Sequence, residues 1–394
     1  MKRKNIKIKR HKYNFYNKNN KKSKSRQALA IILTIVIAAL LGVVGFGLGK
    51  PLIDYFSGNK TPDTSSSGWT PPAETVETAD TSAPASTDGT ETVETEEPIA
   101  VANGAFMLPD GSALNQARLD HVISSAKAQG YTAVVITLKD DTGKFLYKSE
   151  IEDIKDSDAV TGTLTAKQIC DTITDAGLTP QARISTLKDH TSTAEVSDIR
   201  FTTSDDWGWL DAAPNDGGRP WVSPFEPKTA EFMAEITAEL AAAGFEKIIL
   251  ADMKFPPFKT ADEKYLSHLP IKDSEKRLEA LWNVITACCT VANNGGAEVL
   301  LEMSATDMDA ADRNATSAEA VGDKNKLKTV ELLITLDAES VGGQAGANAF
   351  TSKMNGLYSG QSYSVLIGKS GYDAAEYDDI VSAFRDAGIS VFSE

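Results

Sequence analysis

Short apolar runs alternate with amphipathic stretches from about residue 101 to the end of the chain. The runs are rich in Val, Ile and Leu, as buried parallel strands are. We expect strands at Gly104–Leu108, Tyr131–Leu138, Leu178–Ser185, Lys247–Asp252, Glu298–Met303, Val330–Leu336, Tyr363–Gly368 and Ile389–Phe392. Apolar residues at helical spacing predict helices over residues 117–129, 165–176, 228–243, 274–291, 345–354 and 372–386.

Eight strands alternating with helices across about 290 residues predict an α/β fold, the (β/α)8 TIM barrel. A doubly wound open sheet is the alternative. It usually has fewer strands and a glycine-rich first turn that binds a dinucleotide. The first turn here is Pro109-Asp110-Gly111-Ser112, which lacks that pattern.

The N-terminal part of the chain has a different character. Residues 1–26 hold 12 of the 40 Lys and Arg residues and no Asp or Glu, and Ala28–Leu48 carries no charge. The uncharged run would form roughly 30 Å of helix, one hydrocarbon thickness. A cleaved signal peptide is the alternative, but its apolar core would be shorter. We therefore expect a basic cytoplasmic tail (1–26), a single transmembrane helix (27–49) and a C-terminal domain outside the cell membrane.

A linker rich in Thr, Ser, Pro and Glu (50–100) would separate that helix from the barrel domain (101–394). Its composition is typical of disordered chain. Residues 27–394 carry 28 basic and 55 acidic residues, a formal charge of −27, which argues against nucleic-acid binding. The basic tail is better explained by membrane topology and contact with anionic lipid.

The cysteines and histidines indicate neither a disulfide framework nor a metal site. Cys170, Cys288 and Cys289 are odd in number and fall in helix-like segments, so buried thiols are expected. The four histidines show no ligand spacing. No glycine-rich phosphate cradle is apparent, so we expect no cofactor.

Charged residues follow most of the expected strands, where a barrel places its chemistry. Asp140 and Asp141 precede Thr-Gly, so a turn explains at least one of them. Arg183 belongs either to a structural ion pair or to a substrate clamp. The candidates in chain order are Lys139, Asp140, Asp141, Arg183, Asp252, Lys254, Glu302 and Asp337.

Asp252 and Glu302 are the candidate catalytic pair. Alternation places Leu250, Asp252 and Lys254 on one face of the fourth strand, and Glu302 on a face of the fifth. Neighbouring strands lie about 4.8 Å apart. Two carboxyls about 5–5.5 Å apart suit a retaining glycosidase, with one as nucleophile and one as acid/base. Alternatively, Asp252 caps the next turn or pairs with Lys254.

A tryptophan-rich stretch, DDWGWLDAAPNDGGRPWVSPFE (205–226), follows the third strand. Trp207 and Trp221 are candidates for stacking on sugar rings. The same segment could equally be a lid packed on the barrel.

Four segments carry a family resemblance: TAVVITLKDDTGK (132–144), ARIS (182–185), WVSPFEPKTAEF (221–232) and GFEKIILADMKFP (244–256). Together they resemble a glycosyl hydrolase domain family of bacterial surface proteins, itself similar to the α-amylase-type barrels. The resemblance implies a nucleophile at Asp252 and an acid/base at Glu302. The sequence departs from the family pattern at Met253, where the family has an aromatic residue, at Lys254, where it has Arg, and at Thr137, where it often has Asp.

Two functional hypotheses follow. The first is a membrane-anchored glycoside hydrolase that acts on surface or extracellular polysaccharide, with Arg183, Lys139 and Asp337 binding sugar hydroxyls. The second is a non-catalytic glycan-binding or scaffold module of the cell envelope.

Overall fold

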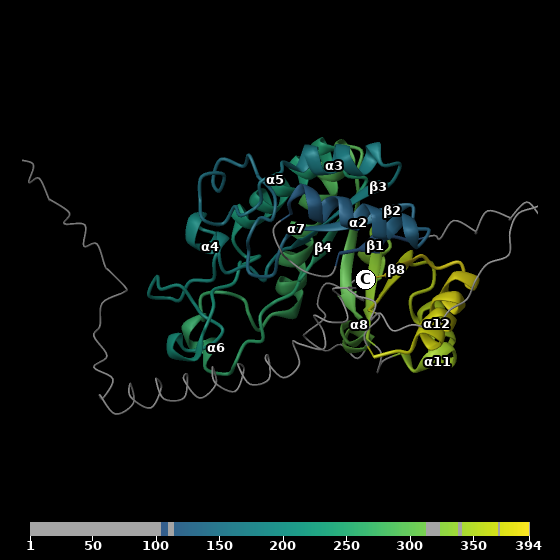
Figure 1. Ribbon diagram of the computed structural model, residues 1–394. Coiled ribbons are helices and arrows are strands. Elements are labelled where there is room, and N and C mark those ends of the chain that lie inside the picture. Colours follow the sequence, from purple (N-terminus) through teal and green to yellow (C-terminus); the bar gives the residue numbers. More distant parts are fainter. Residues whose placement is uncertain (1–103, 109–113, 313–323, 338–340, 369–370, 394) are drawn as a thin grey trace, which may run out of the picture. The chain divides into compact units, whose positions relative to one another are not determined.

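Eight parallel strands close into a barrel in the order β1 to β8 (Figure 1). The computed structural model describes residues 104–108, 114–312, 324–337, 341–368 and 371–393. The (β/α)8 barrel expected from the sequence is confirmed. The strands are β1 (Phe106–Met107), β2 (Ala133–Lys139), β3 (Thr179–Ser185), β4 (Lys247–Ala251), β5 (Glu298–Ser304), β6 (Glu331–Leu336), β7 (Tyr363–Ile367) and β8 (Val391–Ser393).

The expected tail, transmembrane helix and linker all lie outside the described residues. The chain divides into two units, residues 1–91 and 92–394, and every described residue belongs to the second. Among the helices that are described, none is both long enough and apolar enough to cross a membrane.

Six long helices connect the strands, close to the predicted positions: α2 (Gln116–Ala128), α3 (Ala166–Asp175), α5 (Pro227–Ala243), α7 (Ser274–Asn294), α11 (Gly343–Leu357) and α12 (Ala374–Asp386). Local sequence explains their ends. Thr165 forms a capping box with Gln168 at the start of α3. Pro227 begins α5, and Gly244 ends it in the left-handed conformation. Shorter helices, α4 (Ser192–Glu195), α6 (Asp262–Tyr265), α8 (Ala305–Asp312) and α9 (Lys324–Leu327), were not predicted.

Two apolar clusters show which strand residues face inward. The larger cluster joins strands to helices and includes Leu250 of β4. The smaller consists only of residues on or beside strands and fills the barrel: Ala105, Met107, Ala133, Val135, Ile249, Leu300, Leu333, Leu366 and Phe392. Ile249 therefore points inward and Leu250 outward, as alternation along a strand requires.

β3 contributes no residue to the apolar interior cluster. Its residues Ala182 and Ile184 belong to the outer cluster, so Gln181, Arg183 and Ser185 take the inward positions. A polar strand in an otherwise apolar barrel indicates a site at its C-terminal end.

A third cluster lies in the two long segments that follow β3 and β4. We call it the aromatic subcore; it contains Phe201, Trp209, Trp221, Leu266 and Ile271, with Phe225, Phe255 and Phe258 packed against it. Their rings meet at centroid distances of 5.2–6.3 Å, from Phe225–Phe255 to Phe201–Phe225. The subcore anchors both segments beside the barrel.

Candidate active site

Arg183 on β3 and Glu302 on β5 form a two-pronged ion pair. Arg183 Nε donates to Glu302 Oε2 at 2.6 Å, and Nη2 donates to Oε1 at 2.7 Å. The side chains are 20% and 13% exposed, so the pair is largely withdrawn from water. Charge-assisted forks of this kind are strong and fix the orientation of both partners.

Asp252 follows β4 and reaches the same region by an unusual backbone geometry. β4 ends at Ala251, and Asp252 has a φ of +54°. The expectation that Asp252 continues the face of Leu250 is wrong, because Leu250 faces the helices and the chain turns left-handed at Asp252. Few residues other than glycine adopt this conformation, although Asp does so more readily than most.

Ser185, at the end of β3, fixes the Asp252 side chain. The Ser185 hydroxyl donates to Asp252 Oδ2 at 2.8 Å. Ser185 is fully buried and occupies an inward position of β3, so the carboxylate is drawn toward the barrel mouth. Backbone strain held by such contacts is concentrated at functional sites.

The pKa of Arg183 reflects the negative charges at the C-terminal end of the barrel. Burial acts to lower it, but the hydrogen bond and charge of Glu302, followed by the charges of Asp252 and Asp141, raise the pKa above its ordinary value. Glu302 therefore contacts the guanidinium directly, whereas Asp252 and Asp141 act on it through their charge.

Asp141 and Lys188 form an exposed ion pair between two neighbouring rim loops. The hydrogen bond from Lys188 lowers the pKa of Asp141, assisted by the charges of Lys188, His190 and Arg183. The same bond raises the pKa of Lys188. The charge of Asp252 also raises the pKa of Lys188, so the Asp141–Lys188 pair lies near Asp252 at the C-terminal end of the barrel.

Asp140 performs the turn role that its Thr-Gly context suggested. Its Oδ1 atom accepts hydrogen bonds from Thr142 N at 2.9 Å, Thr142 Oγ1 at 2.7 Å and Lys144 N at 2.9 Å. This pattern is an Asx turn, so Asp140 shapes the loop after β2.

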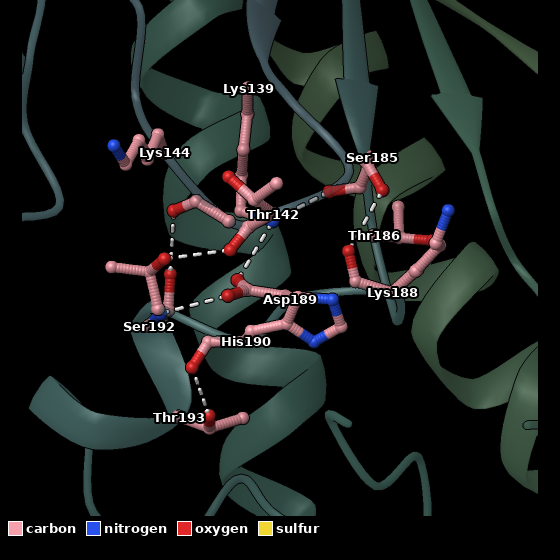
Figure 2. Close-up of polar contacts among 12 residues, drawn as sticks. Lys139, Thr142, Lys144, Ser185, Thr186, Lys188, Asp189, His190, Ser192 and Thr193 are labelled. Atoms are coloured by element: carbon pink, nitrogen blue, oxygen red, sulfur yellow. Dashed lines mark hydrogen bonds and ion pairs between the residues drawn. The ribbon is translucent and has the colours of Figure 1, made fainter. Parts of the chain in front are cut away.

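Lys139 lies behind the rim, where its ammonium is completely buried. It pairs with Asp189 Oδ2 at 2.8 Å and donates to the Ser185 carbonyl at 2.7 Å (Figure 2). Neither side chain of the Lys139–Asp189 ion pair has any exposed surface.

The tryptophans divide between surface and interior. Trp207 is 56% exposed, whereas Trp221 is 6% exposed and belongs to the aromatic subcore. Trp221 Nε1 donates to Asp211 at 3.0 Å, and Trp209 Nε1 donates to Asp262 at 2.9 Å. Trp221 is therefore packed into the protein, as expected for a lid segment, whereas more than half of the Trp207 side chain is exposed.

Lys254 and Asp337 lie on the outer part of the rim. Lys254 is exposed, and its backbone N–H donates to the Asp252 carbonyl at 2.8 Å. Asp337 is exposed directly after β6, and its carbonyl accepts from the Tyr372 hydroxyl at 3.2 Å.

Sequence reasoning missed Ser185, and it placed Lys188 and Asp189 after the third strand without giving them a role. Alternation along β3 from Arg183 would have indicated Ser185. Lys188 and Asp189 stand in the charged stretch Lys188-Asp189-His190, but nothing in the sequence shows which of them is buried. Among the described residues, no group of three or more His, Cys, Asp and Glu side chains is placed to hold a metal ion.

A groove of about 530 Å³ lies beside α12, lined by Tyr131, Tyr372, Tyr377 and Arg385 among others. Asp252 and Glu302 are not among the residues that line it.

Carboxylates at the C-terminal ends of neighbouring strands of a (β/α)8 barrel, as at Asp252 and Glu302, are compatible with glycoside hydrolysis, which uses two carboxyl groups. The family model described as "Putative glycosyl hydrolase domain" matches residues 105–305, just over half of the chain. The chain belongs to this family, and the resemblance stated from its motifs is confirmed. No curated protein matches the chain.

Solved structures are similar to this chain at low sequence identity. The glycoside hydrolase domain of PgaB (BpsB) from Bordetella bronchiseptica is 13% identical, with a TM-score of 0.49, over 74% of this chain and 92% of that one. A hypothetical protein from Ruminiclostridium thermocellum is 18% identical, with a TM-score of 0.38, over 48% and 91%. A sugar phosphate isomerase/epimerase from Parabacteroides distasonis is 15% identical, with a TM-score of 0.40, over 78% and 90%.

Proposed function

We propose that this protein is a membrane-anchored glycoside hydrolase that acts on surface or extracellular polysaccharide. The observation that carries the proposal is the placement of Asp252, directly after β4, and Glu302, on the neighbouring strand β5, at the C-terminal end of the barrel, where Arg183 pairs with Glu302. Membership of a glycosyl hydrolase domain family supports the reaction class. The uncharged run at Ala28–Leu48 supports the anchor, with the N-terminus cytoplasmic and the barrel outside.

Asp252 is the proposed nucleophile. Its carboxylate is held by the Ser185 hydroxyl through Oδ2, which leaves Oδ1 for attack on the anomeric carbon. Attack breaks the glycosidic bond and forms a glycosyl ester on Asp252, and water later hydrolyses that ester. Hydrogen bonding orients the carboxylate before the substrate arrives.

Glu302 is the proposed acid/base. It protonates the leaving oxygen in the first step and takes a proton from water in the second. A carboxylate offers about four lone-pair sites, and Arg183 uses two of them. Water activation can therefore proceed with the ion pair intact, whereas protonation of the leaving group requires the fork to loosen.

The exposed rim residues are proposed to contact sugar: Asp141, Lys254 and Asp337 through hydroxyls, and Trp207 by stacking. Lys139, Asp140 and Trp221 are occupied in the walls of the site. We therefore propose that these three shape the site and do not touch the substrate.

The test is release of reducing sugars from a panel of bacterial polysaccharides by the wild type, Asp252→Asn and Glu302→Gln. We expect Glu302→Gln to lower turnover by about 10²–10⁴-fold, the usual value of general acid–base catalysis, and Asp252→Asn by at least as much. The matched control is Asp171→Asn, because Asp171 is an exposed carboxylate on α3 that pairs with Lys167. Equal activity in the wild type and Asp252→Asn would refute the mechanism.

A non-catalytic glycan-binding module is the second candidate. The observation in its favour is that both oxygens of Glu302 are bonded to Arg183. This candidate expects glycan binding without turnover, weakened by Trp207→Ala. Any turnover that Asp252→Asn abolishes would exclude it.

A further inference from the structure

The Lys139–Asp189 pair is buried at a position where an ion pair is costly. Neither side chain has any exposed surface. Removing two charges from water carries a desolvation penalty that their mutual attraction seldom exceeds, so such pairs usually add little net stability. Their better attested use is to select one arrangement of the surrounding groups.

The pair joins the two rim loops that follow β2 and β3. Asp189 Oδ1 accepts from Ser192 N at 2.8 Å, while Oδ2 takes the Lys139 ammonium at 2.8 Å (Figure 2). The Thr142 carbonyl accepts from the backbone N–H of His190 at 3.1 Å and of Thr191 at 3.0 Å. The loops therefore form one unit around the buried charges.

Gly143 shows how closely these loops fit. A Cβ atom at this position would lie 1.7 Å from Asp189 Oδ1, and its φ is +89°. A side chain is excluded by both sterics and backbone conformation. The first loop thus rests directly on the Asp189 carboxylate.

Ser185 links this unit to the reacting carboxylate. Its carbonyl accepts from Lys139 at 2.7 Å, and its hydroxyl donates to Asp252 at 2.8 Å. One residue therefore receives the buried ammonium on its main chain and orients Asp252 with its side chain. The path from Asp189 to Asp252 runs through Lys139 and Ser185 without a gap.

We propose that Lys139 and Asp189 are positioning residues that fix Ser185 and thereby set the orientation of Asp252. The inference rests on the proposed role of Asp252 as the nucleophile. It assigns Lys139 a task inside the wall of the site, in place of the contact with sugar hydroxyls expected from the sequence.

The test uses the double variant Lys139→Met/Asp189→Asn. It removes both charges at nearly constant volume and keeps an acceptor for Ser192 N, whereas either single change leaves one charge buried and unpaired. We expect kcat to fall by about 10–10²-fold with KM little changed, because a nucleophile displaced by about 1 Å costs up to about 10²-fold.

The matched control is a partly buried ion pair at the opposite end of the barrel, formed by Lys247 and Glu331 at the N-terminal ends of β4 and β6. Lys247 Nζ lies 2.7 Å from Glu331 Oε2, and Ser364 donates to Oε1 at 2.6 Å. Lys247→Met/Glu331→Gln also removes an ion pair and keeps an acceptor. We expect this variant to retain the wild-type kcat even where its melting temperature falls.

A crystal structure of the Lys139→Met/Asp189→Asn variant gives a readout independent of turnover. We expect Ser185 Oγ and Asp252 Oδ2 to separate beyond hydrogen-bond range. If that distance stays at 2.8 Å and kcat is unchanged, the positioning role is wrong. Full activity of Asp252→Asn would instead refute the proposed nucleophile, and the Ser185–Asp252 distance would then decide the positioning role alone.

Discussion

Arg183 reaches across β4 to hold Glu302. The two residues lie on β3 and β5, and Ile249 of β4 is the registered partner of both Arg183 and Leu300. Strand spacing of about 4.8 Å means that roughly 10 Å separates the two backbones. Only a long side chain bridges this distance, and Ala251 is the next inward position of β4, which leaves room for the guanidinium. Arg183 therefore connects β3 to β5 at the C-terminal end of the barrel.

Arg183→Lys tests this organisation. A lysine cannot make the two parallel bonds that the guanidinium makes, so we expect loss of one charge-assisted hydrogen bond and about 1.5–3 kcal/mol of unfolding free energy. Turnover should fall as well, because Glu302 loses its fixed orientation. Urea unfolding and reducing-sugar release measure the two effects. Arg385→Lys on the exposed face of α12 is the control, and an equal loss there would contradict the prediction.

The Asp141–Lys188 pair predicts a defined pH dependence. The pKa of Asp141 is lowered, so its contribution to stability is present above the ordinary Asp value and is lost as the pH falls through the folded pKa. The pKa of Lys188 is raised, so its contribution is present below the ordinary Lys value and is lost as the pH rises through the folded pKa. Because both side chains are partly exposed, we expect the pair to stabilise by about 0–1 kcal/mol.

Urea unfolding of the wild type and Asp141→Asn checks this dependence. The difference in unfolding free energy should be largest near pH 7 and vanish below the folded pKa of Asp141. It should also shrink in 1 M salt, since exposed pairs are screened. A difference that persists at pH 2 would show that Asp141 stabilises the fold through some contact other than its charge.

Periodicity predicted the barrel because buried parallel strands and amphipathic helices leave strong local patterns. Strand β5, expected at Glu298–Met303, is observed at Glu298–Ser304. The boundary of β4 was wrong by one residue, and that residue is Asp252. A single left-handed residue re-aims a side chain without changing the hydrophobic pattern, so alternation could not reveal it.

Which site residues contact one another was harder to predict than which residues belong to the site. The rule that barrel chemistry lies at strand ends selected Arg183, Asp252 and Glu302. It could not show that Arg183 binds Glu302, because the two are 119 residues apart and their contact depends on barrel closure. Nor could it show that Lys139 is buried, since lysines are almost never fully buried and Asp189 comes from another loop.

Glu239 is a further residue that the sequence did not single out. From α5 it accepts hydrogen bonds from Tyr147 Oη at 2.6 Å, Ser149 Oγ at 2.8 Å and Glu150 N at 2.7 Å. Bonds to a charged acceptor contribute about 1.5–3 kcal/mol each, with incomplete additivity. We expect Glu239→Ala to lower the unfolding free energy by at least about 2 kcal/mol, measured in urea.

Glu235→Ala on the same helix is the control, because Glu235 is half exposed and lies 3.9 Å from Lys228, at the limit of an ion pair. Burial, followed by the charge of Glu239, raises the pKa of Tyr147 well above its ordinary value. This tyrosine should therefore be the last to ionise in a spectroscopic titration of the folded protein. Ionisation of Tyr147 near the ordinary pKa of tyrosine would contradict the buried contact.

The thiols of α7 should be unreactive in the folded protein. Burial raises the pKa of Cys288 to about 12 and that of Cys289 to about 11, and all three cysteines are free. Because the thiolate is the reactive form, a disulfide reagent such as DTNB should label both residues slowly at pH 8 and rapidly in urea.

A raised folded pKa also means that the stability contributed by the neutral Cys288 thiol is present below pH 9 and is lost as the pH rises toward 12. The unfolding free energy of the wild type should therefore fall more between pH 8 and pH 10.5 than that of Cys288→Ala, and parallel pH profiles would show that the Cys288 thiol is not held neutral by the core.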